Sequence, residues 1–331
     1  MKSGMIFFFN SLLIFLTFSC NKSANNSNSF KSYSGPAQCN MSKSSSISEM
    51  IIGGEPANGS SVPSGNNTVA ILLYINSNKT ILCSGTIVAS NLILTAGHCF
   101  DDIESDNISP GKVVFSNSYS PATSSNSSEI SCWQRPPNYR PCSADNSYNC
   151  VLNDITWVKI NGTIKSGYSP VSILANPQNI LATESKWMLG FGDNSDNGSN
   201  SGFKNVVEST SSSSNPDTTP NGAIETFNNQ TFSNAFQNYL TVIGPNSGKG
   251  TCEGDSGGPV YVKRDSNNYV LAALTQGSNS LLSPHPTTTS PPYSFDTSKY
   301  ASCSDGYGVY TTVGNYVNWI QSTSGVSLSL Y

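Results

Sequence analysis

The sequence predicts an all-β fold with one short helix near its C-terminus. Apolar runs are short and bounded by turn residues, which is typical of strands rather than helices. Only 11% of the residues are charged, while Ser, Asn and Thr abound. A helical period is convincing only near the end of the chain. These observations favour an exported, β-rich protein with polar loops over a helical cytosolic one.

Each element is expected where apolar residues cluster between turn signals. The helix is expected at about 314–322, with Tyr316, Val317, Trp319 and Ile320 on its docking face. Three polar stretches, 116–150, 193–221 and 278–302, lack a helical or strand period, so we expect surface insertions there. Strands are expected at 69–75, 81–89, 112–115, 155–160, 187–191, 259–262 and 270–274.

The first fifty residues are expected to lie outside the folded domain, which then covers 51–331. Residues 1–19 combine Lys2 with an apolar core too short for a comfortable membrane span, which predicts a signal peptide. Residues 20–50 are rich in Ser, Asn and Lys and predict a flexible leader or propeptide. Cys20 follows the apolar segment and resembles the lipidated cysteine of bacterial lipoproteins. The alternative is an ordinary signal peptide cut near Cys20.

This organisation predicts the location of the protein. We expect it to be secreted, with a bacterial outer-membrane lipoprotein as a second option, in which a lipid on Cys20 would be the only contact with a membrane. The chain has nine cysteines, and removing Cys20 leaves eight, enough for four bridges in an oxidising compartment.

The segment Cys-Glu-Gly-Asp-Ser-Gly-Gly-Pro at 252–259 presents Ser256 as a nucleophile. Glycines on both sides allow a tight turn and leave room for a substrate carbonyl near the N–H groups of Gly254 and Ser256. Those two amides predict an oxyanion hole. Because such a run can also be an ordinary surface turn, the interpretation needs a base and an orienting acid elsewhere.

Both groups have candidates in the chain. His98, one of two histidines, follows small residues and precedes Cys99, which indicates a pinned, accessible loop. Asp154 enters an alternating apolar strand that would bury it, and a buried carboxylate needs hydrogen-bond partners. We therefore expect Asp154 to orient His98, and His98 to take the proton of Ser256.

In this order, with Thr-Ala-Gly-His-Cys, Asp-Ile and Gly-Asp-Ser-Gly-Gly-Pro around them, the three residues resemble those of the chymotrypsin-like (trypsin-family, S1-type) serine proteases. Further motifs at 51–54, 190–192, 308–311 and 316–320 extend the resemblance over about 51–323. It implies two six-stranded antiparallel β-barrels with the triad at their interface. It also implies a serine endopeptidase that acts through an acyl-enzyme, with peptides or proteins as substrates and protein inhibitors as further partners.

The resemblance implies a zymogen that is cleaved before Ile51. Asp255 would need a cation if buried, and in the family this is the new α-amino group of the residue that follows the cut. Losing one member of a buried ion pair costs about 3 to 5 kcal/mol, enough to keep an uncleaved chain inactive. Met50 stands where Arg or Lys is usual, so cleavage by a trypsin-type enzyme is not expected, and self-activation is a hypothesis.

The same carry-over describes a substrate pocket. Gly250 falls where trypsin-like enzymes carry an acidic residue, so a preference for Arg or Lys is not expected. Gly277 and Gly308 match the pocket walls, and Thr275 retains a hydroxyl that could bond Asp154. A neutral, open pocket favours an apolar substrate residue before the cleaved bond.

Disulfides also follow from the resemblance. It pairs Cys83 with Cys99 beside His98, and Cys252 with Cys303 beside the serine loop. The four remaining cysteines allow three connectivities, and the sequence does not choose among them. They are Cys39, Cys132, Cys142 and Cys150.

Other function classes are less consistent with the sequence. A net charge of −4 gives no reason to expect nucleic acid, and no metal site or cofactor is expected. An α/β-hydrolase would place its serine before the acid and the histidine, the reverse of the order here. The main alternative is a catalytically inactive, protease-like binding protein, whose usual mark is the loss of a triad residue.

Overall fold

The computed structural model describes part of one compact unit, Ser32–Tyr331. The expected signal peptide, the leader, Cys20, Met50, Cys39, Cys142 and Cys150 lie outside the described residues. These are 51, 54–57, 65–76, 79–101, 103, 111–140, 153–180, 184–193, 201–209, 226–227, 230–231, 240–243, 250–265, 268–278, 303 and 308–331.

The first sheet is a closed barrel of antiparallel strands in the order β2-β3-β4-β7-β6-β5. Alternate residues of β2, Val69, Ile71 and Leu73, point into the barrel and are fully buried. Ile87 from β3 and Val158 from β7 belong to the same core. The strands are β2 (Thr68–Asn76), β3 (Lys79–Ala89), β4 (Leu92–Thr95), β5 (Lys112–Val114), β6 (Ser127–Gln134) and β7 (Thr156–Ile160).

The second sheet has the order β1-β9-β8-β13-β14-β15-β12, and all its pairings are antiparallel. The predicted fold is confirmed: six strands form each sheet, and the two-residue β1 is added at an edge of the second. A separate hairpin is formed by β10 (Thr226–Phe227) and β11 (Gln230–Thr231). The strands of the sheet are β1 (Glu55–Pro56), β8 (Lys186–Gly190), β9 (Asn205–Ser209), β12 (Leu240–Ile243), β13 (Pro259–Lys263), β14 (Tyr269–Ser278) and β15 (Gly308–Thr312).

The expectation of surface insertions without strands was wrong in two of the three polar stretches. β6 lies within 116–150 and pairs with both β5 and β7, and β9 lies within 193–221. Ser127 and Ser128 are buried in β6, so small hydroxyl residues take positions where the expected pattern required apolar ones. A strand whose buried positions hold serines lacks the alternation of apolar and polar residues by which a strand is recognised in a sequence.

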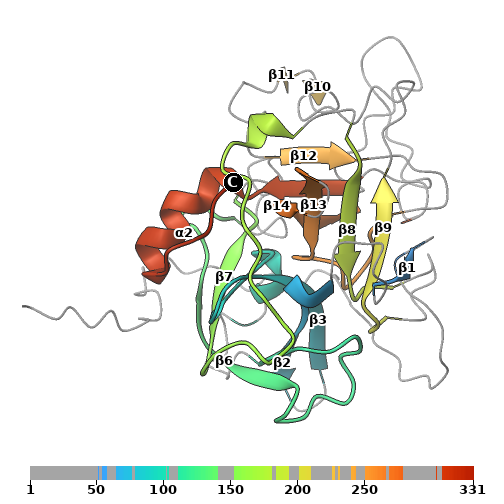
Figure 1. Ribbon diagram of the computed structural model, residues 1–331, viewed down its shortest axis with the longest axis vertical. Coiled ribbons are helices and arrows are strands. Elements are labelled where there is room, and N and C mark those ends of the chain that lie inside the picture. Colours follow the sequence, from blue (N-terminus) through green and yellow to red (C-terminus); the bar gives the residue numbers. More distant parts are fainter. Residues whose placement is uncertain are drawn as a thin grey trace, which may run out of the picture. The chain divides into compact units, whose positions relative to one another are not determined.

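The predicted C-terminal helix is present as a 3₁₀ turn, η6 (Gly314–Tyr316), continued by α2 (Val317–Ser324). It ends at Gly325, whose φ of 68° is the left-handed conformation that closes many helices. Figure 1 shows α2, in red, beside β7 of the first barrel, and the Trp157 indole N–H donates to the Thr323 hydroxyl at 2.9 Å. No helix in the described ranges is long and apolar enough to cross a bilayer.

Side chains from both sheets form a shared core. Leu94 and Trp157 from the first barrel pack in one cluster with Leu189, Tyr261 and Leu274 from the second. The shorter 3₁₀ turns are η1 (Gly65–Asn67), η2 (His98–Phe100) and η4 (Pro177–Asn179). The three predicted catalytic residues meet at hydrogen-bond distance: His98 begins η2, Asp154 stands just before β7, and Ser256 lies in the turn before β13.

Candidate active site

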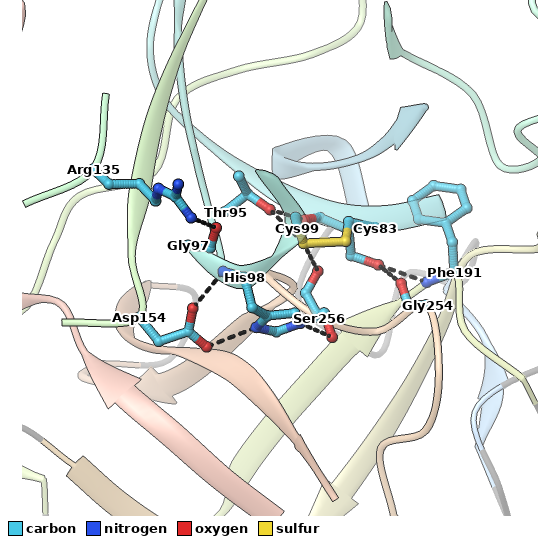
Figure 2. Close-up of a disulfide and its surroundings, with 11 residues drawn as sticks. Cys83, Thr95, Gly97, His98, Cys99, Arg135, Asp154, Phe191, Gly254 and Ser256 are labelled. Carbon is cyan, nitrogen blue, oxygen red and sulfur yellow. Dashed lines mark hydrogen bonds and ion pairs between the residues drawn. A yellow bond between two sulfur atoms is a disulfide. The ribbon is translucent and has the colours of Figure 1, made fainter. Parts of the chain in front are cut away.

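The structure brings His98, Asp154 and Ser256 into one hydrogen-bonded line (Figure 2). Nε2 of His98 lies 2.8 Å from Oγ of Ser256, and Nδ1 of His98 lies 2.8 Å from Oδ2 of Asp154. The His98 side chain is 37% exposed, whereas that of Asp154 is 2% exposed. A partly exposed imidazole therefore links a buried carboxylate to a serine hydroxyl, the arrangement of a nucleophile, its base and the group that orients the base.

The backbone around His98 is fixed from two sides. The N–H of His98 donates to Oδ1 of Asp154 at 2.7 Å. The predicted disulfide between Cys83 and Cys99 ties η2 to β3. His98 begins η2 three residues after β4 ends, so the strand end and the disulfide together restrict where its ring can lie.

Asp154 stands directly before β7, and hydrogen bonds also fix its main chain. The hydroxyl of Thr311, on β15, donates to the Asp154 carbonyl at 3.2 Å. The expected bond from the Thr275 hydroxyl to Asp154 is wrong: Thr275 is fully buried, and its Oγ1 has no hydrogen-bond partner in the described part of the chain. Thr311, which belongs to the motif at 308–311 but was given no role in the sequence analysis, connects Asp154 to the second sheet instead.

Charges around His98 favour its protonated form. Burial alone would lower the pKa of His98, but the charge of Asp154 and its hydrogen bond outweigh burial, so the pKa is raised above 6.5. The charge of Asp101 raises this pKa further, while that of Arg135 opposes it. An imidazole that binds a proton more readily is a better general base once it is deprotonated.

Sequence reasoning missed a cluster of Asp101, Arg135 and Tyr139 behind the histidine. The Arg135 guanidinium donates to the Asp101 carboxylate and to the Gly97 carbonyl, and the Tyr139 hydroxyl donates to Asp101 at 2.9 Å. The guanidinium also lies over the Tyr139 ring, 4.3 Å from its centroid. The signal was weak, because Arg135 and Tyr139 lie in a polar stretch that we expected to be an insertion.

The turn that carries Ser256 is shaped by glycines. Gly254 and Gly257 have φ values of 92° and 81°, which side-chain-bearing residues rarely adopt. The Glu253 carbonyl accepts the Asp193 N–H at 2.7 Å. Because C=O and N–H point in opposite directions across a trans peptide, this bond directs the Gly254 N–H away from Asp193.

Asp255 is fully buried in a cradle formed by the turn after β8. Its carboxylate accepts hydrogen bonds from the N–H groups of Gly192 and Cys252, both at 2.8 Å. A Cβ at Gly192 would lie 2.6 Å from the carboxylate carbon, and a Cβ at Gly190 would collide with the carboxylate. Burial nevertheless outweighs the two donors, and the pKa of Asp255 is raised to about 7.

Ile51 lies fully buried in the second sheet, in a cluster with Met188, Val260 and Tyr310. The charge of Asp255 contributes to raising the pKa of Tyr310, although burial contributes more. Tyr310 is therefore close to both residues of the predicted activation pair: it shares an apolar cluster with Ile51, and the charge of Asp255 acts on its phenol. The two residues that follow Ile51 lie outside the described ranges.

The predicted pocket residues lie on β14, on β15 and just before the serine turn. At Gly250, the position of a Cβ is filled by the Cys303 carbonyl, so the backbone leaves no room there for a side chain. At Gly308, that position is filled by the Tyr310 phenol. Gly277 adjoins a register shift between β14 and β15. Thr251, which the sequence analysis did not select, is buried and lies within 3.2 Å of the Tyr310 hydroxyl.

The second predicted disulfide, Cys252–Cys303, is also present and fixes the start of the serine turn. Cys132, on β6, is disulfide-bonded as well. Its partner lies outside the described residues, since the other four described cysteines are paired with each other.

Comparison with known proteins agrees with this geometry. The family model described as Trypsin matches residues 51–320. Trypsin-1 of Astacus astacus is 24% identical over 248 residues, a match that covers 73% of this chain and 87% of that protein. The matched region contains every described residue of the site.

Proposed function

The chain belongs to the trypsin family of serine proteases, and on this basis we propose that it is an active endopeptidase in which Ser256, His98 and Asp154 form the catalytic triad. The observation that carries the proposal is the unbroken line of two 2.8 Å contacts from Asp154 through His98 to Ser256. A protease-like binding protein would need none of this alignment.

In the proposed reaction, Oγ of Ser256 attacks the substrate carbonyl while Nε2 of His98 accepts the serine proton. The His98 imidazolium then gives this proton to the leaving amine, and the C–N bond breaks to leave an acyl-enzyme. Water then attacks the ester carbonyl while Nε2 of His98 accepts its proton, and the imidazolium gives this proton to Oγ of Ser256 as the C–O bond to the serine breaks, which releases the acid. Asp154 keeps the Nδ1 proton in place and stabilises the imidazolium through its charge.

The proposed oxyanion hole consists of the N–H groups of Gly254 and Ser256. The left-handed conformation of Gly254 and the bond between Asp193 N–H and Glu253 carbonyl support this assignment, because both set the direction of the Gly254 N–H. One such donor accounts for about 10² to 10³ in turnover, so the shape of this turn matters nearly as much as the triad.

Activation is proposed to follow cleavage between Met50 and Ile51. The burial of Asp255, which outweighs its two backbone hydrogen bonds, supports this proposal, since a carboxyl group with a pKa of about 7 gains most from a cation beside it. The buried position of Ile51 near Tyr310 would bring its new α-amino group toward Asp255. The residue before the cut decides which proteases can make it, and Met50 argues against a protease that requires Arg or Lys there.

We propose a preference for an apolar substrate residue before the cleaved bond. The backbone carbonyl that fills the Cβ position at Gly250 supports it, because an acidic side chain cannot stand there without a shift of Cys303. Buried Thr251 and Thr275 add hydroxyls but no charge. The substrates are therefore proteins or peptides with a neutral side chain at that position.

Export is the proposed location, and the two disulfides near the site support it, since such bonds persist in oxidising compartments. The signal peptide, a lipid on Cys20 and the outer membrane remain predictions from the sequence, as do protein inhibitors.

The proposal is tested with a cleavable variant, in which residues 46–50 are replaced by the enteropeptidase sequence Asp-Asp-Asp-Asp-Lys. After the cut before Ile51, we expect hydrolysis of chromogenic peptide anilides with Phe before the anilide, and little with Arg. Ser256→Ala in the same background is the matched control and should show no turnover. A folded, cut protein that hydrolyses no peptide would favour the binding-protein alternative.

A further inference from the structure

Ser84 is a buried serine of the first barrel that contacts the nucleophile turn of the second. It lies on β3 directly after Cys83, is fully buried, and pairs with Ala70 of β2. Its N–H donates to the Ser256 carbonyl at 2.8 Å. The main chain of Ser84 therefore already touches the residue that carries the nucleophile.

The Ser84 hydroxyl makes two further bonds, to different segments of the second sheet. It donates to the Gly254 carbonyl at 2.8 Å and accepts the Phe191 N–H at 2.9 Å. Figure 2 draws Gly254 and Phe191 beside the Cys83–Cys99 disulfide. One hydroxyl thus donates its single proton to the turn that carries Ser256 (residues 252–258, the oxyanion turn) and accepts a hydrogen bond from the turn after β8.

Both partners of this hydroxyl control the predicted oxyanion hole. The Gly254 carbonyl begins the peptide that leads to Asp255, so its direction helps set the φ and ψ of Gly254 and hence the aim of its N–H. Phe191 precedes Gly192, whose N–H donates to the Asp255 carboxylate. Because the Ser84 hydroxyl binds both the Gly254 carbonyl and the Phe191 N–H, the turn around Gly254 cannot rotate freely relative to the turn after β8.

We propose that Ser84 is a positioning residue. Its hydroxyl holds the Gly254 carbonyl, and this keeps the Gly254 N–H in the orientation needed for oxyanion binding. The role rests on the proposed protease function. It does not depend on contact with substrate: Ser84 acts through Gly254, Phe191 and the backbone of Ser256. A buried hydroxyl with both a donor and an acceptor role filled is not replaced by water when it is removed, because the space left is one atom in size.

The test compares Ser84→Ala with the parent protein, both in the cleavable variant and both cut before Ile51. We expect kcat on the Phe anilide to fall about 10- to 100-fold, a partial loss of what one oxyanion donor supplies, while KM changes less than about threefold. A peptide aldehyde, whose adduct places an oxyanion in the hole, should bind more weakly by the same factor as kcat falls.

Thr68→Val is the matched control. Thr68 is also a fully buried hydroxyl residue of the first barrel, but its Oγ1 lies 3.4 Å from the Tyr261 hydroxyl on β13 and makes none of the bonds to Gly254 or Phe191 that Ser84 makes. Its kcat should stay within about twofold of the parent. An equal fall of kcat in both variants, or a loss of Ser84→Ala activity through KM alone, would overturn the positioning role.

A second readout separates this inference from the protease proposal. Hydrogen exchange of the Phe191 amide and of the segment 252–258 should be faster in Ser84→Ala than in the parent, and unchanged in Thr68→Val. If the parent has no turnover, the protease proposal fails, and unchanged exchange would then reject the Ser84 role as well. If Ser84→Ala does not fold, Ser84→Cys, with its weaker donor and acceptor, should give an intermediate kcat, and parental kcat would reject the role.

Discussion

Asp154 binds His98 through both of its carboxylate oxygens: Oδ1 accepts the backbone N–H at 2.7 Å and Oδ2 faces ring Nδ1 at 2.8 Å. The same carboxylate therefore fixes the main chain and the imidazole of one residue. Since Asp154 is itself held from β15 by Thr311, the orientation of His98 depends on both sheets.

Asp154→Asn should lower kcat by about 10⁴ with little change in KM, because an amide NH₂ toward Nδ1 favours the tautomer that carries its proton on Nε2. The variant should fold, as an amide oxygen can still accept the His98 N–H. The measurement is steady-state hydrolysis of the Phe anilide by the cut protein. A loss below tenfold would remove Asp154 from the triad.

Asp101→Asn should move the acid limb of the pH profile of kcat/KM to lower pH. The His98 pKa is raised in the native protein, so activity is lost as the pH falls through a value above 6.5, where the base becomes protonated. Removing the Asp101 charge removes one of the contributions that raise this pKa. A limb that stays in place or moves to higher pH would contradict the charge effect.

Gly192→Ala should abolish most of the activity, because its Cβ would lie 2.6 Å from the Asp255 carboxylate carbon and from the Asp255 nitrogen. The Asp255 cradle would have to open, and the oxyanion turn would move with it. The control is Gly167→Ala, where a Cβ meets nothing within 4 Å and only the φ of 86° is unfavourable. It should cost about 1 kcal/mol of stability and leave kcat unchanged.

Cleavage before Ile51 should stabilise the protein more at pH 8 than at pH 5. The pKa of Asp255 rises from 3.8 to about 7 in the fold, so the folded chain binds the extra proton. The free energy of unfolding that the protonated Asp255 contributes is fully present below about pH 4, and it is lost as the pH rises through about 7. An α-amino partner would keep Asp255 ionised and cancel this loss.

The comparison uses urea unfolding of the cut and uncut forms of the cleavable variant at both pH values. In the uncut form, Asp255→Asn should flatten the dependence on pH, since the amide does not titrate. Equal losses between pH 5 and 8 in the cut and uncut forms would show that Ile51 and Asp255 do not pair.

Much of the site could be predicted from the sequence because its residues stand in short, rigid motifs. Ser256 needs glycines in contiguous positions, and His98 needs a cysteine beside it, so both leave a local signature. The two described disulfides were predictable only through the family resemblance, since nothing local pairs Cys252 with Cys303 across 51 residues.

Contacts that arise only when distant segments meet could not be predicted. Ser84 in β3 approaches Gly254 across 170 positions of the chain, and Arg135 approaches Gly97 across 38. Their side chains satisfy buried polar groups on other strands, which no periodic pattern encodes. The same reasoning explains the failure with Thr275: its hydroxyl is present, but the fold directs Thr311 to Asp154 instead.

The central claim is that Ser256 is a nucleophile activated by His98. The most direct measurement is labelling of the folded, cut protein with a fluorophosphonate, followed by mass spectrometry of the peptide that spans 252–263. We expect stoichiometric label on Ser256, none in Ser256→Ala, and strongly slowed labelling in His98→Ala. A folded protein that begins at Ile51 and takes up no label would contradict the account.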